Sequence, residues 1–235
     1  MLKEFQMASN NQFAQFKKRF LLIALLGAFL LALALPVQAL ADEPRAPSLS
    51  TLSEFIEEIR DDSGDTLRGV YVPGVMAYPI IQQPAGNAGY VSNRDAELTQ
   101  FRMASAYGTV GLLAHNYLAG ASFQNIERGN VIILVYGDGR TQTFLVEDIQ
   151  RYQALQPFSP YSNFRDLDTE SILTAEQLFN KVYRGDFHLT LQTCIEHEGN
   201  LSWGRLFIIA KPFTPVKEKA LDLVRQQYRE ILAIQ

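Results

Sequence analysis

The sequence predicts a mainly β fold: a closed antiparallel barrel with short helices at its periphery and an amphipathic helix at the C-terminus. Two stretches support this prediction, residues 69–149 and residues 187–210, because both are rich in β-branched and aromatic residues and are interrupted by turn residues. Repeated short strands of this kind are typical of antiparallel barrels, in which closure removes the free edges of the sheet.

The most clearly marked hairpin covers residues 131–149. Its two strands, VIILVY (131–136) and RTQTFLVEDI (140–149), flank Gly137-Asp138-Gly139. An Asp-Gly pair is strongly favoured in a two-residue hairpin turn. The turn accounts for the glycines, and nothing nearby follows the pattern of a phosphate-binding loop, so we exclude nucleotide binding.

A second hairpin contains the only cysteine. FHLTLQTCIEHEGNLSWGRLFIIAK (187–211) predicts strands over about 187–196 and 202–210, with Gly199-Asn200 as the turn. With that turn, the numbers of facing residues add up to 399, so Cys194 faces Arg205. Directly opposed side chains lie about 4.5–5.5 Å apart at Cβ. The sequence therefore places a guanidinium beside the thiol, and a nearby cation favours the reactive thiolate form.

Residues 1–41 are predicted to be a targeting segment. The basic residues 17–19 precede an apolar run over 20–35, and Ala39-Leu40-Ala41 fits the small-residue rule for signal-peptide cleavage. We expect export with cleavage after Ala41. An uncleaved anchor is the alternative, although the apolar run is shorter than the roughly 20 residues that a spanning helix prefers. Any membrane contact is expected through this segment alone.

Charge and cysteine usage narrow the function further. The chain has 235 residues and a net charge of −4. Its first 41 residues carry a net charge of +3, so the net charge of the remaining residues is −7. An acidic mature chain argues against a nucleic-acid partner. Exported proteins mostly use cysteines in pairs, so a lone Cys194 is either a reactive thiol or a small buried hydrophobe.

The remaining parts are predicted as follows. A linker over 42–50 leads into a short helix over 51–60, capped by Thr51 or Ser53, and together they form a segment over 42–67. Residues 69–83, interrupted by Pro73 and Pro79, are expected to form an edge or bulged strand.

Two more helices are expected, one before the cysteine hairpin and one at the C-terminus. Residues 150–186 are predicted to be irregular, except for a helix over about 175–184 that begins at a Thr174–Gln177 capping box. Residues 213–235 are predicted to contain an amphipathic helix, which we expect to pack on the barrel; contact with a partner is the alternative.

Three signatures then point to a family. TLQTC (190–194) is followed by Arg205 in the next strand, and Gly111-Leu-Leu-Ala-His115 lies upstream. Phe123 follows, and Arg128-Gly129-Asn130 leads into a strand. In this order the signatures resemble those of the sortases, the cell-surface cysteine transpeptidases of bacteria. The resemblance covers about residues 68–212.

The resemblance implies a catalytic set of Cys194, His115 and Arg205. In it, Cys194 forms an acyl-enzyme, Arg205 stabilises the oxyanion, and His115 transfers protons. Thr193 is expected to bind or orient the substrate or to give structural support. The expected partners are an exported protein with a C-terminal sorting signal and an amine acceptor on the cell wall or a pilin. The expected location is the extracellular face of the cell envelope, either secreted or membrane-anchored.

No cofactor or metal is expected. Asp166, Asp168 and Glu170 alternate and could ligate calcium, which stays open as an alternative, but no glycine-centred twelve-residue loop accompanies them. Cys194, His197 and His188 do not form a zinc set, because His197 falls on the opposite face of the strand and His188 lies about 20 Å along it.

Two other functions remain open. One is an exported barrel that has lost catalysis and serves as a peptide or cell-wall binding module. The other is a cell-wall hydrolase or a different cysteine transpeptidase acting on peptidoglycan, although the usual Ser-x-Gly-Cys pattern of the latter is absent.

Overall fold

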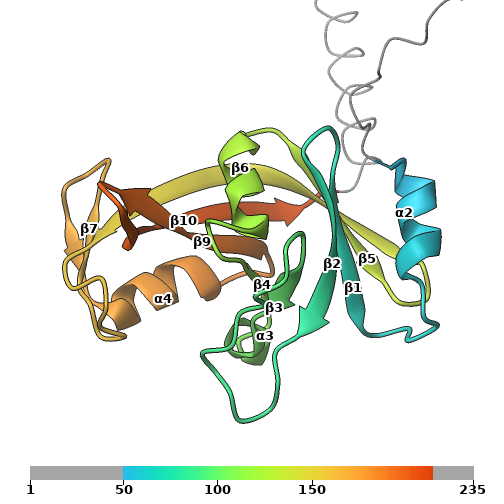
Figure 1. Cartoon of the computed structure of the whole chain (residues 1–235), viewed down its shortest axis with the longest axis horizontal. Helices are drawn as coiled ribbons and strands as arrows, with labels where there is room; N and C mark the ends of the chain where they lie inside the picture. The colour runs from blue at the N-terminus through green and yellow to red at the C-terminus, as the bar shows by residue number, and fades with distance from the viewer. Residues whose placement is uncertain (1–49, 214–235) are drawn as a thin grey trace, which may run out of the picture. The chain divides into compact units, whose positions relative to one another are not determined.

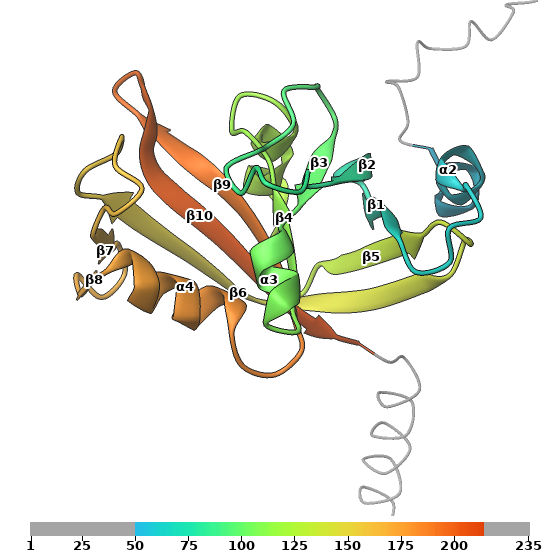
Figure 2. The same ribbon diagram turned by 90° about the horizontal axis from the view of Figure 1, so that it is seen from below.

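The computed structural model describes residues 50–213, which form a mainly β structure with a few short helices (Figures 1 and 2). The strands are β1 (Leu67–Val72), β2 (Met76–Gln82), β3 (Leu98–Gln100), β4 (Val110–Leu113), β5 (Val131–Tyr136), β6 (Thr141–Ala154), β7 (Phe164–Asp166), β8 (Ile172–Leu173), β9 (Leu189–His197) and β10 (Asn200–Pro212). The helices are α2 (Leu52–Ile59), α3 (Arg102–Ala106), α4 (Ala175–Tyr183) and the 3-10 helix η1 (Ala119–Asn125).

Eight of the strands close into a barrel. They are paired in the order β10-β9-β4-β3-β2-β1-β5-β6, and β6 pairs back onto β10. Strands β7 and β8 extend from β6 outside this ring. The predicted closed barrel is confirmed, but it is not wholly antiparallel: β2–β3 and β4–β9 are parallel pairs. Longer connections carry the chain between these strands, as parallel pairing requires.

The targeting segment predicted over 1–41 and the helix predicted over 214–235 lie outside the described residues. Within residues 50–213, none of the helices has both the length and the apolar character needed to cross a membrane.

The two faces of the barrel wall have different environments. Inward-facing side chains of alternate residues form the main core; Leu112, Leu191 and Ile208, for example, are fully buried there. The outer face of β6 and β10 is covered by a second buried cluster that includes Tyr152, Phe207 and residues of α4. Side chains alternate between faces along a strand, so the position of a residue in β9 or β10 decides which environment it enters.

The cysteine hairpin has the predicted register but a different turn. Arg205 pairs with Cys194, as the sequence predicts. The turn, however, is at Glu198-Gly199, where both residues have positive φ (50° and 80°), and not at Gly199-Asn200. His197 pairs with Asn200, and a register shift between Asn200 and Gly204 then restores the predicted pairing. We call residues 200–204 the hairpin bulge.

One expectation about the first half of the barrel is wrong. The single strand expected over 69–83 is a hairpin, β1–β2, because the chain turns through Pro73-Gly74, with Gly74 at φ 74°. Between β2 and β4 the chain forms β3 and α3.

The helices predicted over 51–60 and about 175–184 are confirmed as α2 and α4. Thr51 caps α2, and Thr174 caps α4, each within a complete capping box. The end of α4 is fixed to the barrel by two threonines: Thr190 Oγ1 donates to the Val182 carbonyl oxygen (2.7 Å) and Thr109 Oγ1 to that of Tyr183 (2.9 Å). These bonds satisfy carbonyl groups that a helix end leaves unpaired.

A buried carboxylate ties the last turn of α4 to β7. Asp166 is only 6% exposed, and its carboxylate accepts hydrogen bonds from the backbone N–H groups of Asp168 and Thr169 and from Lys181 Nζ (3.3 Å). Burial opposes the charged form, but these donors outweigh it and hold the pKa of Asp166 below its ordinary value. The stabilisation is therefore present above the unfolded-state pKa of about 3.9 and is lost as the pH falls through the lower folded-state value.

We predict that Asp166→Asn lowers the free energy of unfolding of the full-length chain by about 1–3 kcal/mol at pH 7, because it removes charge-assisted hydrogen bonds. The difference from the native chain should shrink as the pH falls below about 4, where the carboxylate is protonated first in the unfolded chain and, at lower pH, in the folded chain as well. Urea unfolding at both pH values measures it. The exposed Asp168→Asn serves as the control; an equal loss there, or a loss that does not change with pH, would contradict the role of Asp166.

Candidate active site

Cys194 and Arg205 face each other on the outer wall of the barrel. They are directly paired across β9 and β10, and the neighbouring pair Thr193–Leu206 faces inward. Both Cys194 and Arg205 are half-buried, and Cys194 is a free thiol. A thiol with partial access to solvent and a fixed cation opposite it has the environment of a reactive cysteine.

His115 reaches the same row from the other side of β9. Strands β4 and β9 are parallel, with Leu112 beside Leu191 and Leu113 beside Gln192. The alignment continues past β4, since Ala114 N–H donates to the Gln192 carbonyl (3.2 Å). The next residue, His115, therefore stands at the register position of Cys194. Neighbouring strands lie about 4.8 Å apart, so His115, Cys194 and Arg205 occupy adjacent positions across three strands.

Thr193 supports this row from inside. It is 2% exposed, and its Oγ1 donates to the Ala114 carbonyl oxygen (2.9 Å). Because its hydroxyl is buried on the face opposite Cys194, the contact that Thr193 makes in this structure is structural support, and the substrate role expected for it stays a prediction.

Gly120 lets the chain fold back against His115. Its N–H donates to the His115 carbonyl oxygen (3.0 Å), which also accepts from Leu118 N–H (3.0 Å). A Cβ at Gly120 would collide with Thr193 Oγ1 and with the His115 carbonyl. The turn into η1 thus requires glycine at this position, and sequence reasoning gave it no role because its only signal is the packing of distant strands.

The two neighbours that follow His115 contact other parts of the site. The Tyr117 ring is stacked on the imidazole, with centroids 5.2 Å apart and an interplanar angle of 19°. Asn116 Nδ2 donates to the Leu201 carbonyl oxygen in the hairpin bulge (3.0 Å). Sequence reasoning assigned neither residue a role in the site.

The guanidinium of Arg205 is fixed by its own strand. Its Nη1 donates to the carbonyl oxygens of Ser202 (3.0 Å) and Gly204 (2.8 Å) in the hairpin bulge. Among the described residues, Arg205 has no carboxylate partner, and its Nε and Nη2 donors are not used by the protein. An arginine oriented in this way can offer its remaining N–H groups to an oxygen ligand.

A pocket of about 220 Å³ opens beside Arg205. Its lining is mostly apolar and aromatic and comes largely from α4, β7 with the loop before it, and the outer face of β9 and β10. Phe164, Leu178, Phe179, Tyr183, Gln192 and Arg205 contribute to it. Burial raises the pKa of Tyr183 far above its ordinary range, so its hydroxyl stays protonated and donates to Gln192 Oε1. Arg205 is the one charged residue in this lining.

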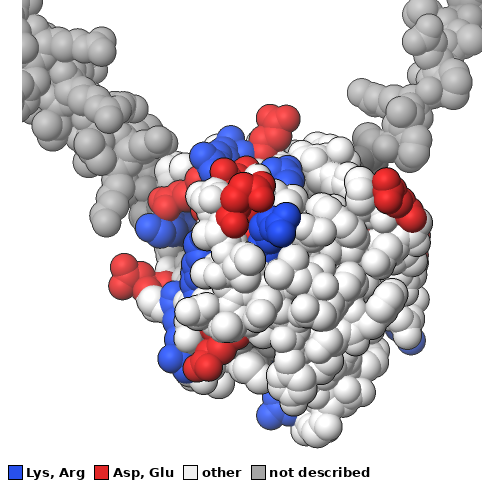
Figure 3. All heavy atoms as spheres, turned by 90° about the vertical axis from the view of Figure 1, so that its left-hand side faces the viewer, with Lys and Arg blue, Asp and Glu red and all other residues white. Residues whose placement is uncertain are grey.

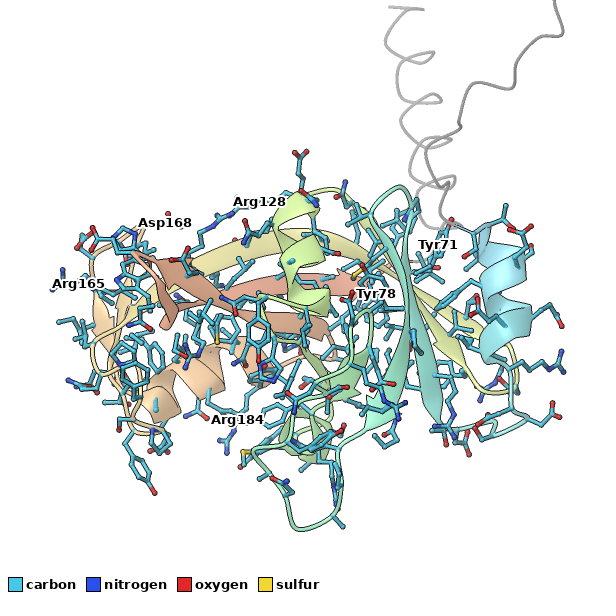
Figure 4. All side chains as sticks on the ribbon, viewed as in Figure 1. Tyr71, Tyr78, Arg128, Arg165, Asp168 and Arg184 are labelled. Carbon is cyan, nitrogen blue, oxygen red and sulfur yellow. The ribbon has the colours of Figure 1, made fainter. Side chains whose placement is uncertain are left out.

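The residues considered for metals are engaged elsewhere. Asp166 is occupied by the bonds to α4, while Asp168 lies at the β7 end of the structure together with Arg165 (Figure 4). Glu170 is exposed and pairs with Arg165 at 3.9 Å. His188 is buried between the carbonyls of Asp186 and Val182, and His197 packs against Trp203. Among residues 50–213, no group of His, Cys, Asp or Glu side chains is arranged to hold a metal ion.

Charged side chains are unevenly distributed at this end of the molecule. Figure 3 shows that acidic and basic residues are gathered on one part of the face at the β7 end, with a broad uncharged area beside them. Two of the most exposed aromatic residues, Phe158 (87%) and Tyr161 (86%), are in the loop before β7. This end of the molecule therefore exposes apolar and aromatic surface beside charged residues of both signs.

Comparison with known proteins gives partial similarities to sortase structures. The lid mutant of Streptococcus agalactiae sortase C1 is 15% identical, with a TM-score of 0.40 over 67% of this chain and 73% of that one. Sortase C-1 from Actinomyces oris is 13% identical, with a TM-score of 0.43 over 73% and 82%.

Listeria monocytogenes sortase A is 14% identical, with a TM-score of 0.41 over 64% and 89%. No family model and no curated protein matches the sequence. Because the superpositions are partial, we assign the barrel from its own strand pairing.

We predict that Thr193→Val lowers the free energy of unfolding by about 1–3 kcal/mol, because the substitution keeps the shape of the side chain but leaves the buried Ala114 carbonyl without its donor. Urea unfolding of the full-length chain measures the effect. Thr141→Val, at an exposed threonine in β6, should change stability by less than about 0.5 kcal/mol. Equal stability of Thr193→Val and the native chain would show that this hydrogen bond does not hold the His115 segment.

Proposed function

We propose that this protein is a cysteine transpeptidase of the sortase type. The observation that supports the proposal most is the row on the outer wall of the barrel formed by His115, just past the end of β4, Cys194 in β9 and Arg205 in β10. The row combines a nucleophile, a group that transfers protons near neutral pH and a cation that stabilises an oxyanion. These are also the residues on which the sequence resembles sortases.

The first half-reaction forms an acyl-enzyme. The Cys194 thiolate attacks the carbonyl carbon of a peptide bond in the substrate, and the carbonyl oxygen becomes an oxyanion. The free N–H groups of Arg205 donate to this oxyanion, where the charge of the transition state develops. The C–N bond then breaks, a thioester forms on Cys194, and the His115 imidazolium gives a proton to the departing amine.

The second half-reaction transfers the acyl group. A primary amine attacks the thioester carbon, His115 takes the proton that the amine releases, and the thiolate of Cys194 leaves. The amide bond of the product replaces the one broken, so no energy source is needed. Water in place of the amine would give hydrolysis.

Substrate and location follow from the same proposal. The substrate is an exported protein with a C-terminal sorting signal, and the acceptor is an amine on the cell wall or a pilin. The segment over 1–41 would direct the enzyme to the outside of the cell and keep it at the membrane if it is not cleaved. The aromatic pocket beside Arg205 would receive an apolar side chain of the signal peptide.

We predict that the full-length chain, purified in a mild detergent and mixed with a library of signal-like peptides, gains the mass of a peptide fragment on Cys194. Addition of a primary amine should remove the adduct and release an amide product, and Cys194→Ala should form no adduct. Arg205→Lys should lower kcat/KM by at least about a hundredfold, because a point ammonium does not reproduce the guanidinium fork.

Intact-protein mass spectrometry and product analysis measure these outcomes. Near-normal turnover in Cys194→Ala or Arg205→Lys would rule out the proposed mechanism. No adduct with any peptide, together with an unreactive thiol, would instead favour a barrel that binds peptides or wall polymers without catalysis.

A further inference from the structure

Asn116 connects the two sides of the candidate site. It follows His115 directly, and its side chain donates to Leu201 in the hairpin bulge, 85 positions further along the chain. In the described part of the chain, this is the hydrogen bond that joins the segment after His115 to the segment before Arg205.

The hairpin bulge needs such an anchor because it lies outside the regular ladder. The pairing of β9 with β10 is interrupted between Asn200 and Gly204, so this segment has fewer cross-strand bonds to hold it. Its Gly204 end is fixed by packing: a Cβ at Gly204 would lie 2.5 Å from the Tyr152 carbonyl oxygen of β6. Within the bulge, Ser202 N–H donates to Asn200 Oδ1 (3.0 Å).

The direction of the Arg205 guanidinium depends on this bulge. Both acceptors of Arg205 Nη1, the carbonyls of Ser202 and Gly204, belong to it. One of them, Ser202, directly follows the residue that Asn116 holds. A shift of the bulge would turn the Ser202 carbonyl and release the guanidinium from the two acceptors that orient it.

We propose that Asn116 is a positioning residue that holds the hairpin bulge so that Arg205 faces Cys194. It also makes the placement of His115 and the placement of Arg205 depend on each other, since one hydrogen bond joins their segments. The effect on turnover rests on the proposed function, whereas the effect on the geometry of Arg205 and Cys194 does not.

The test measures the charge near Cys194 without any substrate. Cys194 in the full-length chain is alkylated with iodoacetate, an anion, and separately with iodoacetamide, which is neutral. The ratio of the two rates reports the nearby guanidinium, because ionisation of the thiol and access to it affect both reagents alike. Arg205→Gln gives the ratio that remains when the cation is absent.

We expect Asn116→Ala to lower the ratio of the iodoacetate rate to the iodoacetamide rate. The logarithm of the ratio should fall at least half of the way from the native value to the Arg205→Gln value. Hydrogen exchange of residues 200–204 should become about fivefold faster, as expected for loss of one net hydrogen bond. Asn163→Ala, an exposed asparagine in the loop before β7 whose side chain makes no hydrogen bond in the described structure, is the matched control and should match the native chain in both measurements.

With a peptide that the native chain acylates, Asn116→Ala should reduce kcat by about tenfold to a hundredfold and change KM by less than about threefold, because misplacement affects the transition state more than binding. An unchanged alkylation ratio, or unchanged exchange in residues 200–204, would overturn the proposal. If the ratio falls but no peptide acylates the native chain, the positioning role stands and the transpeptidase assignment fails.

Discussion

One ladder of backbone hydrogen bonds through β4, β9 and β10 determines the position of every candidate catalytic side chain. Side chains alternate between the two faces of a strand, so a slip of one residue in either pairing would send Cys194 or Arg205 into the barrel. The inward residues of the same strands oppose such a slip, since Leu112, Leu191 and Ile208 are fully buried in the main core and would then be removed from it. The core therefore specifies the site.

The outer wall beside the site is shaped by a second set of contacts. Helix α4 covers the outer face of β6 and β10 around Phe207 but leaves Cys194 and Arg205 half-buried. Its C-terminal end is fixed to the barrel by hydrogen bonds from Thr109 and Thr190. A fixed wall of this kind keeps the aromatic pocket beside Arg205 formed before any ligand arrives, which lowers the ordering cost of binding.

Sequence reasoning predicted the parts of the site that depend on local pattern. The facing of Cys194 and Arg205 was predicted correctly, although the turn is one residue earlier and the hairpin bulge compensates for the difference. The place of His115 beside Cys194 depends on the parallel pairing of β4 with β9, which joins residues 79 positions apart and has no local signal. Only the family resemblance brought His115 into the set, and the contacts of Asn116 and Gly120 depend on the same long-range pairing.

Cross-linking tests the row of three side chains most directly. Adjacent strand positions fall within the Cα separation that a disulfide needs, about 4.4–6.8 Å. Mild oxidation of the His115→Cys variant should therefore join position 115 to Cys194, which proteolysis and mass spectrometry would identify. Ser105→Cys, exposed on α3 at the opposite end of β4, should form no such link. If Ser105→Cys links to Cys194 as readily as His115→Cys does, or if neither links, then β4, β9 and β10 do not bring His115 and Cys194 together.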